Sequence, residues 1–217
     1  TSGGNGIRDA QATLGWVSGK AGFRIGVSSR ADDGLAGANG HNQVRRFNFR
    51  SDWRASFDDE VQFRAGNLEI DAGRGFAGEA GSPPHDGFYQ SGFVQLDWRR
   101  TLDQNNDLSL TLSRMQEDYR DSFSYSLLPL GISDSIEVSA NGKTVNDSVT
   151  LQHTFRHGSG LRVVWGGELR REQVTSLPIF NTSEALVTDF KRLFANAEWR
   201  LTPSWVINAG VMGEQNS

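Results

Sequence analysis

KRLFANAEWRL, residues 191–201, alternates between apolar and polar side chains along most of its length. One set of alternate positions holds Leu193, Ala195, Ala197, Trp199 and Leu201, and the other holds Arg192, Asn196, Glu198 and Arg200. Successive side chains of a β-strand point to opposite faces of a sheet. The pattern therefore predicts a strand with one apolar face and one polar, mostly charged face.

The same two-residue period recurs along most of the chain, whereas helical spacing of apolar residues is scarce. We expect about ten strands of roughly 9 to 14 residues. Their expected ranges are 8–18, 22–31, 42–55, 60–71, 88–100, 107–119, 145–157, 160–173, 189–201 and 204–214. The predicted fold class is all-β, an antiparallel up-and-down meander that forms part or all of a transmembrane β-barrel. A single β-barrel segment is expected over residues 1–217.

The connections between these strands alternate in length. GKAG, FDDE, TLDQNND, HGSG and TPSW read as short turns, and long loops are expected at about 32–41, 72–87, 120–144 and 174–188. Short turns at one end and long loops at the other are typical of outer-membrane barrels, with the short turns on the periplasmic side. Five tryptophans near the short turns match the aromatic girdle of such barrels: Trp16, Trp53, Trp98, Trp199 and Trp205.

A soluble β-sandwich is the main structural alternative, because it also alternates and would bury Trp and Phe in its core. The regular alternation of connection lengths and the Arg-rich, Lys-poor polar face favour the barrel. An open sheet of ten strands would also expose two edges, which closure would remove. We expect the strands to pair in sequence order, and the pattern does not determine whether the edges meet.

Composition excludes several classes of protein. Hydrophobic residues make up 36% of the 217 residues and the mean hydropathy is -0.49, so no transmembrane helix is expected. A net charge of -4 gives no support for nucleic-acid binding. The absence of cysteine excludes disulfides and thiolate metal sites. The chain starts at Thr1, without an initiating Met or a signal peptide, so we expect a mature protein or a piece of a longer one.

Four stretches carry a family resemblance: NQVRRFNFRSDWRASFDDEVQFRAGN, LQHTFRHGSGLRVVWGGELRRE, DFKRLFANAEWRLTPSW and VINAGVMGE. In their texture of strands and turns they resemble the middle barrel strands of TonB-dependent outer-membrane receptors. The similarity covers nearly the whole chain, although no single invariant motif supports it. Barrels of that family have about twenty-two strands, and they surround an N-terminal plug that engages the TonB protein.

The resemblance implies a barrel fragment from roughly the second to the eleventh strand, because nothing in the chain resembles the plug. It implies a place in the bacterial outer membrane and uptake of a scarce nutrient, such as a siderophore–iron complex or cobalamin. The implied partners are outer-membrane lipid, TonB by way of the missing plug, and the small-molecule nutrient. Without the plug and the remaining strands, this piece alone is not expected to transport anything.

The stretch GRGFAG, residues 73–78, fits the spacing of a dinucleotide-binding turn. Such a turn requires a helix after it, and the following EAGSPPHDG forbids one through its prolines and glycines. We therefore interpret the stretch as the start of a long loop. His153 and His157 are about 13 Å apart along a strand, too far to share one metal ion. No serine lies in a nucleophile elbow, so we expect no catalytic residue, no metal site, no cofactor and no enzymatic activity.

Two sets of residues are candidates for function. The first set is expected to face the barrel lumen, where it would hold a plug or attract anionic cargo, or simply pair with acids on the same face: Arg46, Arg50, Arg162, Arg170, Arg192, Glu198 and Arg200. The second set lies in or beside the long loops, where aromatic and Arg side chains commonly anchor ligands: Arg74, Phe76, His85, Asp86, Tyr89, Tyr119, Phe123 and Tyr125.

Three functional hypotheses follow. The first is a receptor for TonB-dependent active uptake. A passive porin-like channel would share the alternation but would lack an upstream plug. A soluble β-sandwich that binds carbohydrate or protein would be monomeric without detergent and would have a packed core of two sheets.

Overall fold

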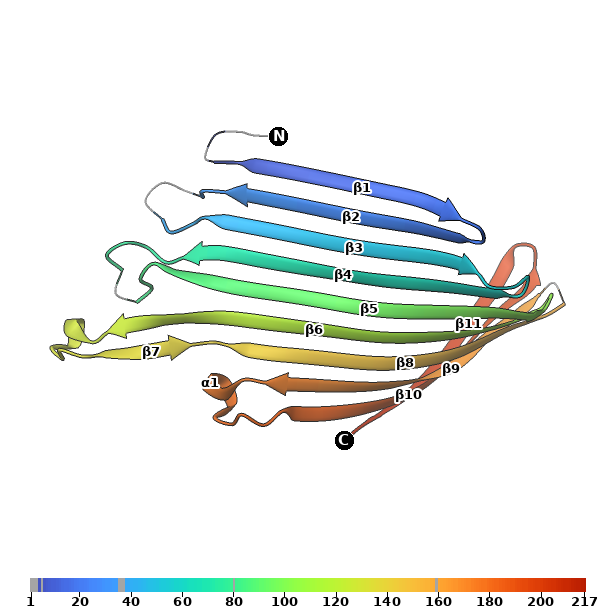
Figure 1. The fold of residues 1–217 in the computed structure, drawn as a ribbon. Helices are drawn as coiled ribbons and strands as arrows, with labels where there is room; N and C mark the ends of the chain where they lie inside the picture. The colour runs from blue at the N-terminus through green and yellow to red at the C-terminus, as the bar shows by residue number, and fades with distance from the viewer. Residues whose placement is uncertain (1–3, 5, 35–37, 80, 159) are drawn as a thin grey trace.

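The computed structural model of the chain describes residues 4, 6–34, 38–79, 81–158 and 160–217. These residues form an antiparallel sheet in which ten strands follow one another in sequence order, and β7 pairs beside them with β6 (Figure 1). The strands are β1 Arg8–Ser18, β2 Ala21–Asp32, β3 Asn42–Arg54, β4 Asp59–Arg74, β5 His85–Asp103, β6 Asn106–Ser126, β7 Ser135–Ser139, β8 Gly142–His157, β9 Leu161–Thr175, β10 Leu186–Thr202 and β11 Trp205–Asn216. The short helices are η1 Leu128–Leu130 and α1 Leu177–Phe180.

The ten predicted strands and their meander order are confirmed, and the main differences lie at the loop end. β6 has 21 residues and runs to Ser126, well into the expected loop at 120–144. The same expected loop contains β7, which pairs with the end of β6, and the expected loop at 174–188 contains α1. Residues 119–126, YRDSFSYS, continue the two-residue period, but the charged Asp121 interrupts the row of aromatic side chains and weakens the pattern.

The alternation of connection lengths is also confirmed. Connections of two to four residues join the strands at one end, and the longer ones lie together at the other end (Figure 1). Residues 35–37 and 80, in two of the expected loops, and residue 159, in an expected turn, lie outside the described residues.

The pairing register places each set of alternate side chains on one face of the sheet, because directly paired residues point to the same side. Arg50 pairs with Arg64, and Ser148 pairs with Arg170. Following the register across the sheet puts the whole first candidate set on this side, which we call the polar face: Arg46, Arg50, Arg162, Arg170, Arg192, Glu198 and Arg200.

The opposite face, which we call the apolar face, changes character along the strands. Beside the short turns it carries Leu108, Leu110 and Leu112 on β6, and toward the long loops the same strand continues with Arg114 and Asp118. β8, β9 and β10 repeat this change. All five predicted girdle tryptophans lie on the apolar face close to the short turns. The strands thus combine an apolar band at one end with a charged extension at the other.

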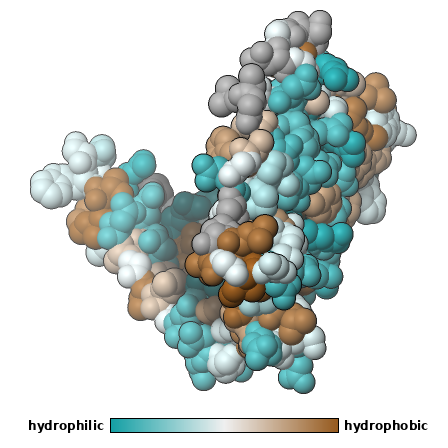
Figure 2. All heavy atoms as spheres, turned by 90° about the vertical axis from the view of Figure 1, so that its left-hand side faces the viewer, coloured by the Kyte–Doolittle hydropathy of each residue, from teal (hydrophilic) through white to brown (hydrophobic). Residues whose placement is uncertain are grey.

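The sheet has almost no core of its own. Among the described residues, the buried hydrophobic side chains are Val44 and Val145 alone, while Leu169 and Leu193 are 59% and 74% exposed. Figure 2 shows two arms of the curved sheet with a hollow between them. A soluble β-sandwich would need a second sheet packed on the apolar face, and the described residues supply none. That alternative is therefore wrong for this chain.

The sheet is not closed, because β1 and β11 do not pair within the described residues. No helix in this part of the chain is long and apolar enough to cross a membrane.

Candidate functional site

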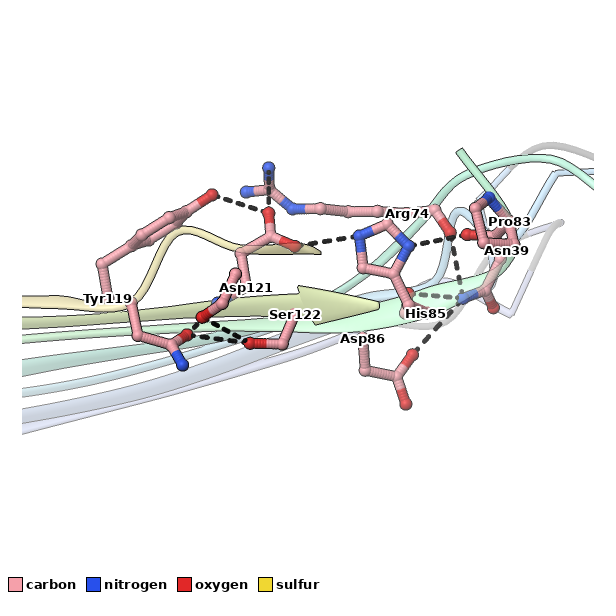
Figure 3. A network of polar contacts seen from close by, with 10 residues as sticks. Asn39, Arg74, Pro83, His85, Asp86, Tyr119, Asp121 and Ser122 are labelled. Carbon is pink, nitrogen blue, oxygen red and sulfur yellow. Dashed lines mark hydrogen bonds and ion pairs between the residues drawn. The ribbon is translucent and has the colours of Figure 1, made fainter. Parts of the chain in front are cut away.

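A polar network joins the loop ends of β4, β5 and β6 on the polar face (Figure 3). Its centre is the Asp121 carboxylate, whose side chain is only 12% exposed. One carboxylate oxygen lies 2.9 Å from His85 Nε2. The other accepts a hydrogen bond of 2.7 Å from the Tyr119 hydroxyl and lies 3.1 Å from an Arg74 guanidinium nitrogen.

Strand pairing alone brings these residues together from distant positions in the sequence. Arg74, the last residue of β4, pairs with His85, the first residue of β5. Gly87 of β5 in turn pairs with Asp121 of β6. The backbone N–H of Asp121 donates to the Asn141 side chain at 2.8 Å, so the connection into β8 also supports the network.

Aromatic contacts enclose the two basic side chains. The His85 ring lies 4.7 Å from the Phe123 ring, and the Arg74 guanidinium lies 5.6 Å from the centre of the Tyr119 ring. The second ring nitrogen of His85 faces the Pro83 carbonyl at 2.6 Å. A carboxylate and a carbonyl are both acceptors, so a protonated His85 can donate to both at once.

Tyr119 lies beyond the apolar band, between the charged Asp118 and Arg120 of the other face. Burial raises the pKa of its hydroxyl, and the hydrogen bond to Asp121 raises that pKa further. The hydroxyl therefore remains a donor over a wider range of alkaline pH than in a free tyrosine.

A cavity of about 490 Å³ opens beside the network. Arg74, His85 and Asp121 line it together with Phe76 and Phe123. Its wall includes a tight turn at Gly75, where φ is +78° and a Cβ atom would collide with the Pro83 carbonyl. The site can therefore offer the Arg74 guanidinium, the Asp121 carboxylate and two aromatic rings to a ligand, whereas both ring nitrogens of His85 already have partners.

The structure brings five of the eight candidate ligand residues to this site, and it separates three. Arg74, Phe76, His85 and Phe123 line the cavity, and Tyr119 contacts Arg74 and Asp121. Asp86 points to the opposite face, where its side chain is 73% exposed (Figure 3). Tyr89 donates to Glu117 at 2.6 Å, and Tyr125 is placed opposite Ile136 of β7.

Phe76 lies in a connection, and Tyr89 and Tyr119 lie in strands, as expected. The other five lie within strands and not in the expected loops, because β4, β5 and β6 extend further than the alternation indicated: Arg74, His85, Asp86, Phe123 and Tyr125. Asp121 and Asn39 were missed. Asn39 donates to the His85 carbonyl at 2.8 Å and so ties a neighbouring loop to the site. The two-residue spacing of Tyr119, Asp121 and Phe123 was the available signal for Asp121.

Ion pairs connect much of the polar face below the network. Arg50 pairs with Asp52 at 2.8 Å. Arg192 bridges Glu168 at 2.9 Å and Glu214 at 2.6 Å. Arg170 lies 3.4 Å from Glu172 and above the Phe190 ring. The remaining candidates on this face form no ion pair with a described residue: Arg46, Arg162, Glu198 and Arg200.

The described residues contain no cluster of three or more His, Asp or Glu side chains that could hold a metal ion. His153 accepts a hydrogen bond of 3.1 Å from Trp165. The described part of the connection after GRGFAG contains no helix, so the turn lacks the helix N-terminus of a dinucleotide site.

Solved structures provide the comparison with known proteins. The ferric yersiniabactin uptake receptor FyuA from Yersinia pestis superposes with a TM-score of 0.75 at 14% identity, over 98% of this chain and 37% of the receptor. The siderophore receptor PiuA from Acinetobacter baumannii gives 0.74 at 9% identity, over 99% of this chain and 41% of the receptor. The ferric-catecholate import receptor Fiu from E. coli K12 gives 0.70 at 14% identity, over 99% and 43%.

The fold is that of part of a TonB-dependent receptor barrel. At these identities the likeness concerns the fold. No family model matches the chain, and no curated protein matches it by sequence. The chain spans less than half the length of the TonB-dependent receptors that it matches.

Proposed function

We propose that residues 1–217 form one segment of the barrel wall of an outer-membrane receptor for TonB-dependent uptake of a scarce nutrient. The observation that carries the proposal is the uncovered apolar face. Its band of Leu, Val, Phe and Trp side chains has no protein partner among the described residues. Burying such a band in lipid is favourable, because about 25 cal/mol is gained for each Å² of apolar surface removed from water.

The polar face then lines the barrel lumen. Its arginines and acids are suited to contact a plug domain through ion pairs, and the plug of the intact protein would engage TonB. The proposed partners are outer-membrane lipid, TonB and a small-molecule nutrient, and they do not include nucleic acid. We assign the segment no catalytic role and no cofactor.

The cavity beside Asp121 is the proposed point of ligand contact in this segment. The partly exposed Arg74 guanidinium favours an anionic group on the ligand, and the aromatic rings favour a ligand with a flat apolar part. A siderophore–iron complex combines such features, and the solved neighbours include a siderophore receptor, a ferric-catecholate import receptor and a ferric yersiniabactin uptake receptor. Cobalamin is the second nutrient class that we propose to test.

The test uses the intact protein that contains this chain, produced in bacteria that lack their own siderophore and cobalamin receptors. Uptake of iron-55-labelled siderophore complexes and of cobalt-57-labelled cobalamin is measured with and without TonB. We expect TonB-dependent uptake of one of these ligands. Uptake that continues unchanged without TonB would indicate a passive channel, and a protein absent from the outer membrane would refute the proposal.

Arg74→Gln tests the ligand site separately. Losing a charge-assisted contact should weaken ligand binding by about tenfold. Arg54→Gln is the matched control, because Arg54 lies on the same face at the short-turn end and pairs with Glu60 at 3.4 Å. Equal effects of the two substitutions on the dissociation constant would remove the cavity from the proposal.

A further inference from the structure

The apolar face carries a row of alternating charges across four strands. Arg114 of β6 pairs in register with Asp147 of β8, which pairs with Arg171 of β9, which pairs with Asp189 of β10. Strands lie about 4.8 Å apart, so the row is roughly 14 Å long. It lies where the apolar band ends and the charged extension begins.

The row itself holds two cations and two carboxylates, and the neighbouring Lys191 adds a third cation. Arg114 lies 3.3 Å from Asp147, and Arg171 donates two hydrogen bonds of 2.7 and 2.8 Å to Asp189. The exposed Lys191, two residues from Asp189, forms no ion pair with a described residue. A guanidinium has five N–H donors, so both arginines keep donors for another anion. Their side chains are 56% and 55% exposed.

A second row runs beside the charged one and is apolar. Phe63, Leu96, Leu112, Val149 and Leu169 pair in register across five strands, and Leu169 then pairs with Lys191. The two rows line a single cavity of about 730 Å³. The cavity is therefore amphiphilic, with an apolar floor and a charged margin in which three cations accompany two carboxylates.

We propose that this groove binds a membrane lipid with a phosphorylated headgroup. An acyl chain lies on the apolar row, and the phosphate accepts hydrogen bonds from Arg114, Arg171 and Lys191. Charge complementarity at a fixed depth favours this occupant, because the cations lie at the boundary of the apolar band, where the headgroups of a bilayer lie. The inference rests on the proposed membrane location of the apolar face.

The experiment measures lipid retention by native mass spectrometry of the intact protein in detergent micelles. The probes are a lipid with two phosphate groups and its dephosphorylated analogue with the same acyl chains. Each basic residue near a membrane surface strengthens anionic-lipid binding by about fivefold. The double variant Arg114→Gln/Arg171→Gln should therefore weaken retention of the phosphorylated lipid by about 25-fold.

Arg45→Gln/Arg120→Gln is the matched control. Both arginines lie on the apolar face and pair with acids, at 3.7 Å from Glu69 and 3.0 Å from Asp118, but they lie outside the groove. This control should leave retention unchanged. Asp147→Asn/Asp189→Asn should strengthen retention, because it frees both guanidinium groups for phosphate.

Equal retention of the two lipids, or equal loss in the groove variant and the control, would overturn the lipid site. Insertion of the protein into the outer membrane is scored independently by membrane fractionation. An inserted protein without phosphate preference refutes the lipid site alone, whereas a protein that does not insert refutes the proposed function and the lipid site with it.

Discussion

Asp121→Asn should loosen the loop ends of β4, β5 and β6 and leave the rest of the sheet intact. The carboxylate makes three side-chain contacts of 2.7–3.1 Å, with Tyr119, His85 and Arg74. Each contact to a charged group contributes roughly 1.5 kcal/mol, and an amide, with one acceptor oxygen, keeps about one of them. Solvation of Arg74, which is 46% exposed, offsets part of the loss. We expect about 2 kcal/mol of local stability to be lost.

That loss corresponds to about a 30-fold increase in the local opening equilibrium. Hydrogen–deuterium exchange of the protein in detergent micelles measures it, at the amides of residues 85–89 and 117–123. Asp118→Asn is the matched control, three residues away on the same strand, where Asp118 pairs with Arg120 on the other face. Similar exchange in both variants, or equal acceleration at the short turns, would refute the reasoning.

Three further predictions concern single side chains. Gly166→Ala should lower the free energy of unfolding by about 1–3 kcal/mol, because its Cβ would collide with the Leu151 carbonyl; an unchanged urea midpoint in detergent would contradict this. The raised pKa of Tyr119 means that the folded state holds the hydroxyl proton more tightly than the unfolded state. The stability that this proton contributes to the folded state is complete below about pH 10 and is lost as pH rises through the raised pKa. The Tyr119→Phe variant lacks this contribution, so its urea midpoint should fall less between about pH 9 and 11 than that of the unsubstituted protein. The buried Ser176 hydroxyl donates to the Asn141 carbonyl at 2.6 Å. Ser176→Ala should therefore lower the local stability by about 1 kcal/mol. Faster hydrogen exchange in residues 177–180 would measure this loss, and unaltered exchange would count against it.

The sequence predicted the strands well where one face is apolar and the other is polar. In residues 191–201 and 161–171, each side chain reveals its face through its own chemistry, so the register and the two faces follow from a period of two. The first candidate set was placed on one face for this reason. The alternation is less informative beyond the apolar band, where both faces carry polar groups. The loop end of β6, the whole of β7 and α1 lie in that region.

The candidate site was harder to predict, because its parts are far apart in the chain. His85 and Asp121 are 36 residues apart, and Asn39 and His85 are 46 residues apart. Their meeting depends on the exact lengths of β4, β5 and β6, since a shift of one residue would turn a side chain to the other face. Composition could suggest Arg74 and His85 as ligand residues, but it could not identify Asp121 as the group that joins them.

The order of the strands has a consequence for how this sheet can assemble. Each strand pairs with the preceding one except β8, which pairs with β6 because β7 folds back on the loop end of β6. Pairing neighbours closes only short loops, so the entropy lost at each step is small. The chain can therefore assemble one hairpin at a time, with each free edge as the template for the next. Because each strand depends only on its neighbours, adding or removing one hairpin would change such a wall by two strands while the remaining hairpins keep their register.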